Sequence, residues 1–240
     1  MTISSNTLFQ FTGNFNTLKS ILSCGYIWPR YCTEFCWGGY SFALPMACFC
    51  DIPLSQISSH VQFYGNYGIG LSKSWSDKQK GIASVLYTKP SSQVANHVAY
   101  MLKKWQKEPF NLNTEDFILL SRIKKYSGET YSKKENRFVK RCFYNEREWR
   151  YIPKGLLPNN CFVKHGKQKI KFDEHLNDKF KDELIFSAND IKYLIVSTEA
   201  EREKLIYLLF NDKLLGRASK EETTLAMSKI LTVKQIQEDF

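Results

Sequence analysis

Signatures of several common protein classes are absent from this 240-residue sequence. No apolar run approaches the roughly 18–20 residues that cross a bilayer. The first residues, MTISSNTLFQFTG, lack the basic and apolar regions of a secretory signal. No low-complexity tract interrupts a chain that is 43% hydrophobic and 15% aromatic, which excludes global disorder. We therefore expect a soluble, cytoplasmic protein without a membrane partner.

Motifs of several large enzyme classes are also missing. No Gly-x-Gly-x-x-Gly leads from a strand into a helix, and neither a Walker A motif nor a Ser/His/Asp signature is found. The seven cysteines are an odd number, and the spacing of the five within residues 24–50 fits no compact zinc module. We expect reduced, mostly buried thiols and no metal.

Positive charge is concentrated in one part of the chain. Residues 122–171 hold 15 Lys and Arg against 4 Glu, while the net charge of the whole chain is +10. Such a block favours a polyanion, which would be nucleic acid, a dinucleotide cofactor or an acidic protein. A solvated basic face without a partner is the alternative. The closely spaced candidates for binding are Lys133, Lys134, Arg137, Lys140 and Arg141.

Strand and helix patterns are mixed without a βαβ rhythm, which predicts the α+β class. Strands are expected in residues 6–13, 41–50, 67–73, 82–88, 141–153 and 184–197. Helices are expected in residues 14–24, 51–64, 91–107, 114–126, 198–210 and, in two pieces, 219–240. A polar, basic loop is expected at 127–137. The predicted fold is a mixed, mainly antiparallel sheet with flanking helices, in a single domain of residues 1–240 whose residues 215–240 form a helical tail.

The helix expected at residues 51–64 carries a histidine and a tyrosine off its apolar face. Asp51 is expected to cap its N-terminus, and Gly65 to end it. His60 and Tyr64 lie four residues apart, so the helix presents them together. They suit an acid–base pair or a stacking platform. The alternative is that His60 only makes hydrogen bonds within the fold and has no catalytic role, which is common for a lone histidine on a helix.

The segment NEREWR is the sharpest local feature of the sequence. Side chains alternate on a strand, so Glu146, Glu148 and Arg150 would share one face. Three charges on one face suit a solvated sheet face with a ladder of salt bridges, or a cleft. In a cleft, a carboxylate beside a guanidinium can bind a ribose hydroxyl or stabilise a developing cation.

Six segments together resemble the AbiGi family of abortive phage-resistance proteins, which is described as the antitoxin-like partner of a two-component system. They are LFQFTG, ILSCGYIWPRYCTE, MACFCDIPLSQISSHVQFYGNYGIGLSKSW, NEREWRYIP, FSANDIKYLIV and QIQEDF, and they span almost the whole chain in order. The resemblance implies a role in defence against phage.

More remotely, the order of features is similar to that of ADP-ribosyltransferase-like folds. That resemblance implies NAD as the cofactor, with a glutamate that orients the ribose hydroxyl and an aromatic ring beside the nicotinamide. The implied catalytic residues are Glu148, Glu146, His60 and Tyr64. The implied cofactor-binding residues are Gln10, Thr12, Tyr67 and Arg150.

Two functions of different classes follow. The first is an anti-phage enzyme that transfers ADP-ribose from NAD to nucleic acid or protein. The second is a non-catalytic antitoxin or regulatory module that binds a cognate toxin, another defence protein or nucleic acid through residues 122–171. Gln10 stands where many transferases have His or Arg, and this departure supports the second function. A nuclease that uses His60 is a third hypothesis, but none of the other three histidines is a convincing partner for it, and a carboxylate cluster for metal is lacking.

Overall fold

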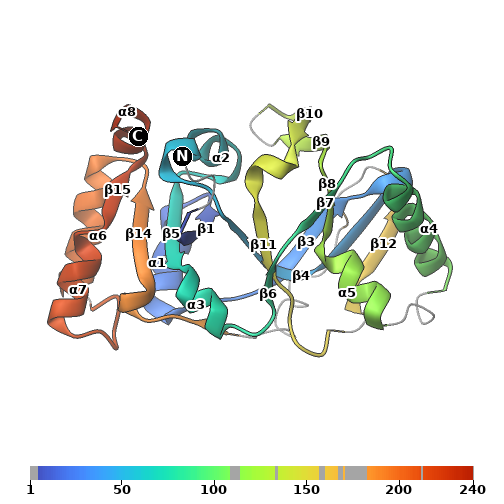
Figure 1. The fold of residues 1–240 in the computed structure, drawn as a ribbon. Coiled ribbons are helices and arrows are strands. Elements are labelled where there is room, and N and C mark those ends of the chain that lie inside the picture. Colours follow the sequence, from blue (N-terminus) through green and yellow to red (C-terminus); the bar gives the residue numbers. More distant parts are fainter. Residues whose placement is uncertain are drawn as a thin grey trace. The chain divides into compact units, whose positions relative to one another are not determined.

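The computed structural model describes residues 5–108, 114–132, 135–156, 160–166, 170, 183–211 and 213–239 (Figure 1). The chain divides into two compact units. Unit 1 is formed by Met1–Ile27, Phe49–Lys80 and Glu183–Phe240, and unit 2 by Trp28–Cys48 and Gly81–Asp182. The single-domain organisation expected from the sequence stays a prediction.

Unit 1 is built on a sheet of four strands. Their order is β15 (Ile230–Thr232), β14 (Ile191–Val196), β5 (Tyr67–Ser72) and β1 (Thr7–Thr12). β14 and β15 are parallel, and the other neighbours are antiparallel. The end of β4 (Tyr40–Cys50) extends this sheet, because Cys50 pairs with Phe9 of β1. A separate two-stranded ladder joins β2 (Tyr26–Ile27) to β13 (Leu184–Ile185).

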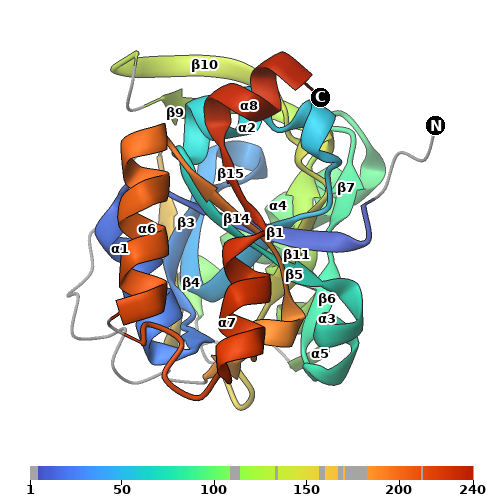
Figure 2. The ribbon, with the colours of Figure 1, turned by 90° about the vertical axis from the view of Figure 1, so that its left-hand side faces the viewer.

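Helices cover this sheet. They are α1 (Phe15–Cys24), α2 (Ser58–Tyr64), α3 (Lys73–Lys78), α6 (Glu199–Asn211), α7 (Lys220–Met227) and α8 (Val233–Asp239), with 3-10 turns η2 (Leu54–Gln56) and η7 (Ala188–Asp190). Both α6 and α7 contact β14 (Figure 2). A buried apolar cluster between β1, α2 and α8 includes Phe9, Cys50, Ile52, Leu54, Ile57, Val61, Ile195, Val233 and Ile236.

Local sequence signals account for the first helix. The Asn14 side chain accepts a hydrogen bond from the Thr17 amide at 2.8 Å, which satisfies a free N–H group at the start of α1. Gly25 ends the helix with φ 73°, in the left-handed region that favours glycine. The expected helix boundary at Gly25 is therefore confirmed.

Unit 2 contains several smaller ladders. β4 pairs antiparallel with β3 (Arg30–Phe35) and β12 (Phe162–His165), and β11 (Glu148–Tyr151) lies between β4 and β6 (Ile82–Ser84). β7 (Leu86–Thr88) pairs parallel with β8 (Ile123–Lys125), and β9 (Ser127–Ser132) pairs antiparallel with β10 (Arg137–Cys142). The helical elements are α4 (Gln93–Lys107), α5 (Thr114–Arg122), η1 (Trp37–Gly39) and η4 (Phe143–Glu146).

The core of unit 2 is apolar and rich in aromatic rings. Helix α4 begins at a Ser92 cap and buries one stripe of its surface, as its apolar spacing predicts. The stripe includes Val98, Leu102 and Trp105, and the Trp105 ring lies edge-on to Phe117 of α5 at 5.9 Å. Burial of this stripe holds α4 and α5 against β4.

The α+β class with a mainly antiparallel sheet and flanking helices is confirmed, since most ladders of the described strands are antiparallel, while β14–β15 and β7–β8 are parallel. None of the helices in the described part of the chain combines the length and apolarity that a bilayer crossing needs.

Three local predictions were wrong. Asp51 does not cap a helix: its carboxylate accepts hydrogen bonds from the Ser5 amide at 2.8 Å and from Lys73 Nζ at 2.7 Å. The loop expected at 127–137 is largely the β9–β10 hairpin. The single strand expected at 141–153 is interrupted by η4, because Arg147 has a φ of 43° and turns the chain before β11.

Two further segments differ from expectation in part. Residues 82–88 form two short strands, β6 and β7, which pair with different partners. Residues 215–240, expected as a helical tail, contain α7 and α8 but also β15, which joins the sheet of unit 1 through β14.

Candidate functional site

A cluster of charged side chains lies inside unit 2, where β3, β8, β10, η4 and β11 each contribute one or two members. We call it the buried ion cluster; its members are Glu34, Lys124, Arg141, Glu146, Glu148 and Arg150. Three carboxylates thus meet three cations. Ions leave water only at a large cost in free energy, which such pairing offsets.

Arg150 occupies the centre of the cluster. Its side chain is fully buried, and its Nε donates to Glu148 Oε1 at 2.6 Å. Its Nη2 donates to Glu34 Oε1 at 2.8 Å, while its Nη1 donates to the Ser121 carbonyl at 3.1 Å. The planar guanidinium therefore has acceptors on each side, an arrangement that lysine could not reproduce.

Lys124 joins the two glutamates of the NEREWR segment. Its Nζ lies 2.7 Å from Glu148 Oε2 and 2.9 Å from Glu146 Oε2. Arg141 reaches the other oxygen of Glu146, with Nε 3.4 Å from Oε1. Glu146 and Glu148 are 3% and 5% exposed, so the prediction of a solvated face is wrong.

The cluster sets the protonation of Glu148. Burial acts to raise the pKa of this carboxyl, but the charges and hydrogen bonds of Arg150 and Lys124 outweigh burial and hold the pKa well below its usual range. Burial likewise acts to lower the pKa of Arg150, and Glu148 with Glu34 reverses this effect. Glu148 is therefore a carboxylate at neutral pH.

A phenol completes the surroundings of Glu148. The Tyr87 hydroxyl accepts a hydrogen bond from the Glu148 amide at 2.8 Å. Burial, followed by the negative charge of Glu148, raises the pKa of Tyr87. With its amide and both carboxylate oxygens engaged, Glu148 has the surroundings of a structural anion more than those of a proton acceptor.

His60 and Tyr64 lie together in unit 1, as their spacing predicted. Their rings are 4.5 Å apart, and the His60 ring is 5.1 Å from that of Phe11 on β1. His60 is buried, whereas Tyr64 is 39% exposed. The pair packs against an aromatic residue of the first strand, while Glu146 and Glu148 belong to unit 2.

The remaining expected cofactor residues of unit 1 lie on β1 and β5. Gln10 is half-buried, and its Oε1 has no hydrogen-bond partner among the described residues. Thr12 pairs with Tyr67 across the ladder. The Tyr67 hydroxyl donates to Glu201 Oε1 at 2.6 Å, and burial together with Glu201 raises the pKa of Tyr67 to about 12.

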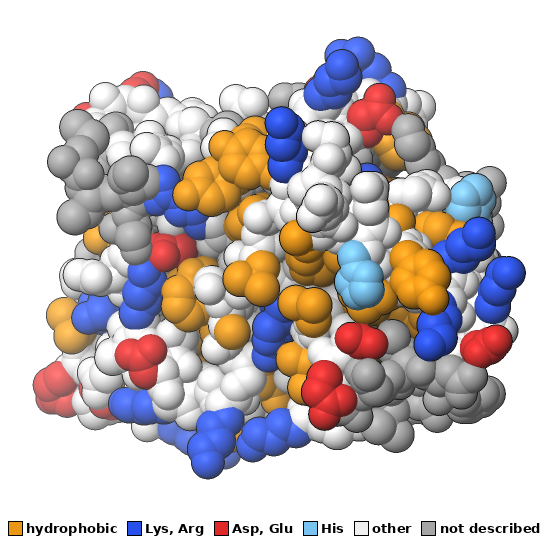
Figure 3. All heavy atoms as spheres, turned by 45° about the vertical axis from the view of Figure 1, so that its right-hand side comes forward, with side chains coloured by type: hydrophobic (Ala, Val, Ile, Leu, Met, Phe, Trp, Pro, Cys, Tyr) orange, Lys and Arg blue, Asp and Glu red, His pale blue; other side chains and the backbone are white. Residues whose placement is uncertain are grey.

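The expected basic residues are distributed over the β9–β10 hairpin. Lys133 and Lys134 fall outside the described residues. Arg137 is exposed and pairs with Glu135 at 2.6 Å, and Lys140 is exposed on the same strand. Figure 3 shows a group of Lys and Arg side chains at the upper right of that view, next to an acidic side chain. Arg141 differs, since it belongs to the buried ion cluster.

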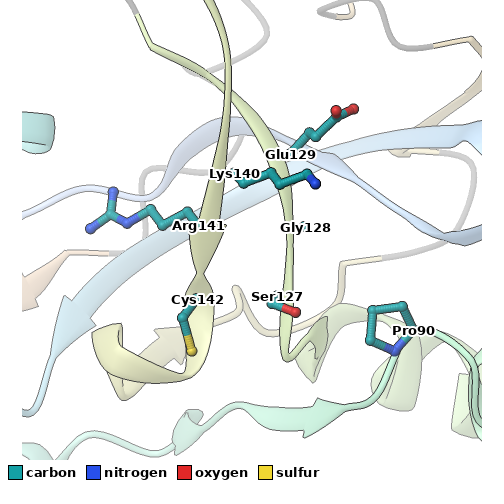
Figure 4. A pocket seen from close by; sticks show the side chains of 7 residues that line it. All are labelled: Pro90, Ser127, Gly128, Glu129, Lys140, Arg141 and Cys142. Carbon is teal, nitrogen blue, oxygen red and sulfur yellow. The ribbon is translucent and has the colours of Figure 1, made fainter.

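A hollow of about 550 Å³ lies at the base of the hairpin. Figure 4 shows Lys140 and Glu129 on one side of the strands and Arg141 directed to the other. Cys142 and Pro90 line its lower part. All seven cysteines of the chain are free thiols, and no group of three His, Cys, Asp or Glu side chains that could hold a metal occurs within the described ranges.

Sequence reasoning missed two of the six members of the buried ion cluster, and also the tyrosine beside it. Glu34 lies within an aromatic strand segment, and Lys124 lies at a predicted helix end, where a cation is ordinary. Neither pattern shows that these residues contact Glu148. A single acidic residue in the otherwise half-buried segment RYCTEF was the one available signal for Glu34.

Comparison with known proteins matches residues 39–197 to the family model described as "Putative abortive phage resistance protein AbiGi, antitoxin". The chain belongs to the AbiGi family. The family resemblance expected from the six sequence segments is therefore confirmed.

A relative from Lactococcus lactis subsp. cremoris, named abortive phage resistance protein AbiGi, is 29% identical over 222 residues. The aligned region covers 82% of this chain and 89% of the relative. No solved structure matches, so an ADP-ribosyltransferase-like fold has no support from this comparison.

Proposed function

We propose that this AbiGi-family protein is the antitoxin of a phage-defence pair and acts by binding a cognate toxin, without catalysis. The family description names an antitoxin, which supports the role. The structural observation that supports a function without catalysis is the buried ion cluster. The two glutamates expected to act on a ribose are buried and paired with cations.

Glu148 would need to exchange its partners in order to act on a substrate. Both of its carboxylate oxygens are held within 2.7 Å of a cation, and its side chain is 6% exposed. Removing one partner from a buried ion pair costs on the order of 3–5 kcal/mol. Transfer of ADP-ribose from NAD therefore stays a prediction of the remote resemblance, to which the geometry of Glu148 lends no support.

The antitoxin role predicts a conditional growth defect. We would place the chromosomal segment that surrounds this gene in a plasmid, with the gene intact or deleted. Deletion should kill or arrest the host, and expression of the chain from a second plasmid should restore growth. Growth that is unaffected by the deletion would remove the antitoxin role.

A second set of plasmids separates binding from catalysis. The double variant Lys124→Gln with Glu148→Gln removes one buried charge of each sign and keeps the side chains similar in size. Provided that its thermal transition shows a folded protein, this variant should restore growth as the wild type does. A folded variant that fails to protect would mean that these residues act chemically.

A further inference from the structure

Two exposed tyrosines form a flat aromatic surface beside the β9–β10 hairpin. The rings of Tyr126 and Tyr144 are stacked, with centroids 5.0 Å apart and an interplanar angle of 16°. They are 43% and 45% exposed. Tyr87 supports Tyr144 edge-on at 5.5 Å, and the Tyr144 amide donates to the Tyr126 carbonyl at 3.1 Å. Large rings held rigidly at an exposed position are poorly explained by packing alone.

The hollow next to these rings is lined by two cations, Lys140 and Arg141, and by one acid, Glu129. Tyr126 directly precedes Ser127, which lines the hollow, and Tyr144 follows its lining residue Cys142 by two positions. The Lys140 side chain extends on the same side of the hairpin as that of Glu129, its partner in the ladder (Figure 4). Among the residues that the structure describes, none forms an ion pair with Lys140. Its charge is therefore available to an external anion.

The surrounding sequence strengthens the preference for an anion. Residues 124–147 contain eight Lys and Arg against three Glu. The buried ion cluster uses Lys124 and Arg141 together with Glu146, which leaves six Lys and Arg against two Glu in this segment of the sequence. The segment that contains both tyrosines therefore has a net positive charge, which favours a polyanion.

We infer that this hairpin surface, defined by Tyr126, Tyr144 and Lys140, binds single-stranded nucleic acid. A base would stack on the outer face of the tyrosine pair, and Lys140 would contact a neighbouring phosphate. Aromatic rings next to cations are the combination that binds unpaired bases, because stacking needs an accessible base face.

Other polyanions fit the surface less well. Bases within a duplex are stacked on one another and could not reach the rings, so a duplex would use the cations alone. An acidic protein segment would use the cations but has no planar group that requires two stacked rings. Single-stranded RNA or DNA satisfies both features at once.

The inference stands independently of the antitoxin role. It concerns one surface of unit 2, and the toxin can bind elsewhere on the chain. Loss of one property would leave the other testable, because the first is measured with purified protein and the second by growth.

The test is fluorescence anisotropy of labelled oligonucleotides with the full chain. The probes are oligouridylate, oligothymidylate and an RNA duplex of equal length. Both single strands, or one of them, should bind more tightly than the duplex. Tyr144→Ala should weaken single-strand binding about tenfold, in keeping with the stacking contribution of one base. Lys140→Glu should weaken binding and reduce its salt dependence by about one phosphate contact.

Matched controls come from exposed residues of α4 in the same unit. Tyr100 is 62% exposed, and Lys103 is also exposed. Tyr100→Ala and Lys103→Glu should leave the affinity unchanged, which separates the hairpin surface from general charge and aromatic content.

Three outcomes would overturn the inference. They are absence of single-strand binding at low salt, equal binding of the duplex, and equal losses in the α4 controls. If Lys140→Glu abolished protection from the toxin while no oligonucleotide bound, the hairpin surface would belong to a protein partner. In that case the antitoxin role would stand and the nucleic-acid inference would fall.

Discussion

Arg150 and Glu148 lie two residues apart on β11 and make two hydrogen bonds side by side, Nε to Oε1 at 2.6 Å and Nη2 to Oε2 at 3.1 Å. Both side chains extend from one face of the strand into the interior of unit 2. An ion pair between near neighbours in the sequence thus becomes the centre of a cluster whose other members come from four more elements.

Removing the negative charge of Glu148 should destabilise the protein strongly. In Glu148→Gln, the buried Arg150 and Lys124 each lose one of their anionic partners and the cluster gains a net positive charge, so we expect the free energy of unfolding to fall by about 3–5 kcal/mol. Urea unfolding followed by circular dichroism measures the change. The control is Glu135→Gln, whose pair with Arg137 is exposed, and it should cost no more than about 1 kcal/mol. Equal effects of the two variants would contradict a structural role for the cluster.

The same carboxylate should make stability depend on pH. Because the pKa of Glu148 is lower in the folded protein, its contribution is present above the unfolded pKa of about 4.3 and is lost as the pH falls through the folded value. The difference in unfolding free energy between wild type and Glu148→Gln should therefore shrink on acidification below this unfolded value. Urea titrations at several pH values measure it. A difference that stays constant with pH would assign the effect of the variant to something other than charge.

Gly65 should not tolerate a side chain. It ends α2 with a φ of 120°, and an added Cβ would collide with the carbonyl of Thr12. Gly65→Ala should therefore cost at least about 1–3 kcal/mol and loosen the packing of His60 and Tyr64. The matched control is Gly13→Ala, since Gly13 has no atom within 4 Å of the new Cβ. Thermal melts compare the two, and similar melting temperatures would show that the turn can rearrange.

The proposed antitoxin function predicts that the chain does not bind NAD. Calorimetric titration of the wild type should give no binding heat with NAD, and neither Tyr64→Ala nor Glu148→Gln should change this result. Binding that weakens in Tyr64→Ala would place NAD near the exposed tyrosine of α2, and would bring back the transfer of ADP-ribose as a function. Stability of each variant, measured in the same buffer, serves as the control.

Sequence patterns predicted the features that are determined by residues close to one another in the sequence. The stop at Gly25 marked the end of α1, and alternation placed Glu148 and Arg150 on one face. Asp51 shows where local reasoning fails. Its carboxylate resembles a helix cap in sequence, yet its partners Ser5 and Lys73 are 46 and 22 residues away. A contact of that kind is decided by the packing of the whole unit.

The β9–β10 hairpin was missed for a related reason. Both faces of β10 carry polar residues, such as Arg137 and Lys140, so the strand lacks the alternation of apolar and polar residues that predicts a half-buried strand. The short strand β15 depends on pairing with β14, which its own three residues do not reveal. Burial of the ion cluster was equally hidden, because Glu34 and Lys124 come from distant segments.

The division of the chain into alternating segments has a consequence for synthesis on the ribosome. Strand β5 of unit 1 pairs with β14, so its outer edge stays open until residues 191–196 have been translated, more than a hundred positions later. Such distant pairing slows folding and leaves strand edges exposed while the chain is incomplete. Synthesis of unit 2 is complete earlier, since its last segment ends at residue 182. The order of assembly should therefore run from unit 2 to unit 1, and shortened chains that stop before β14 should aggregate instead of folding.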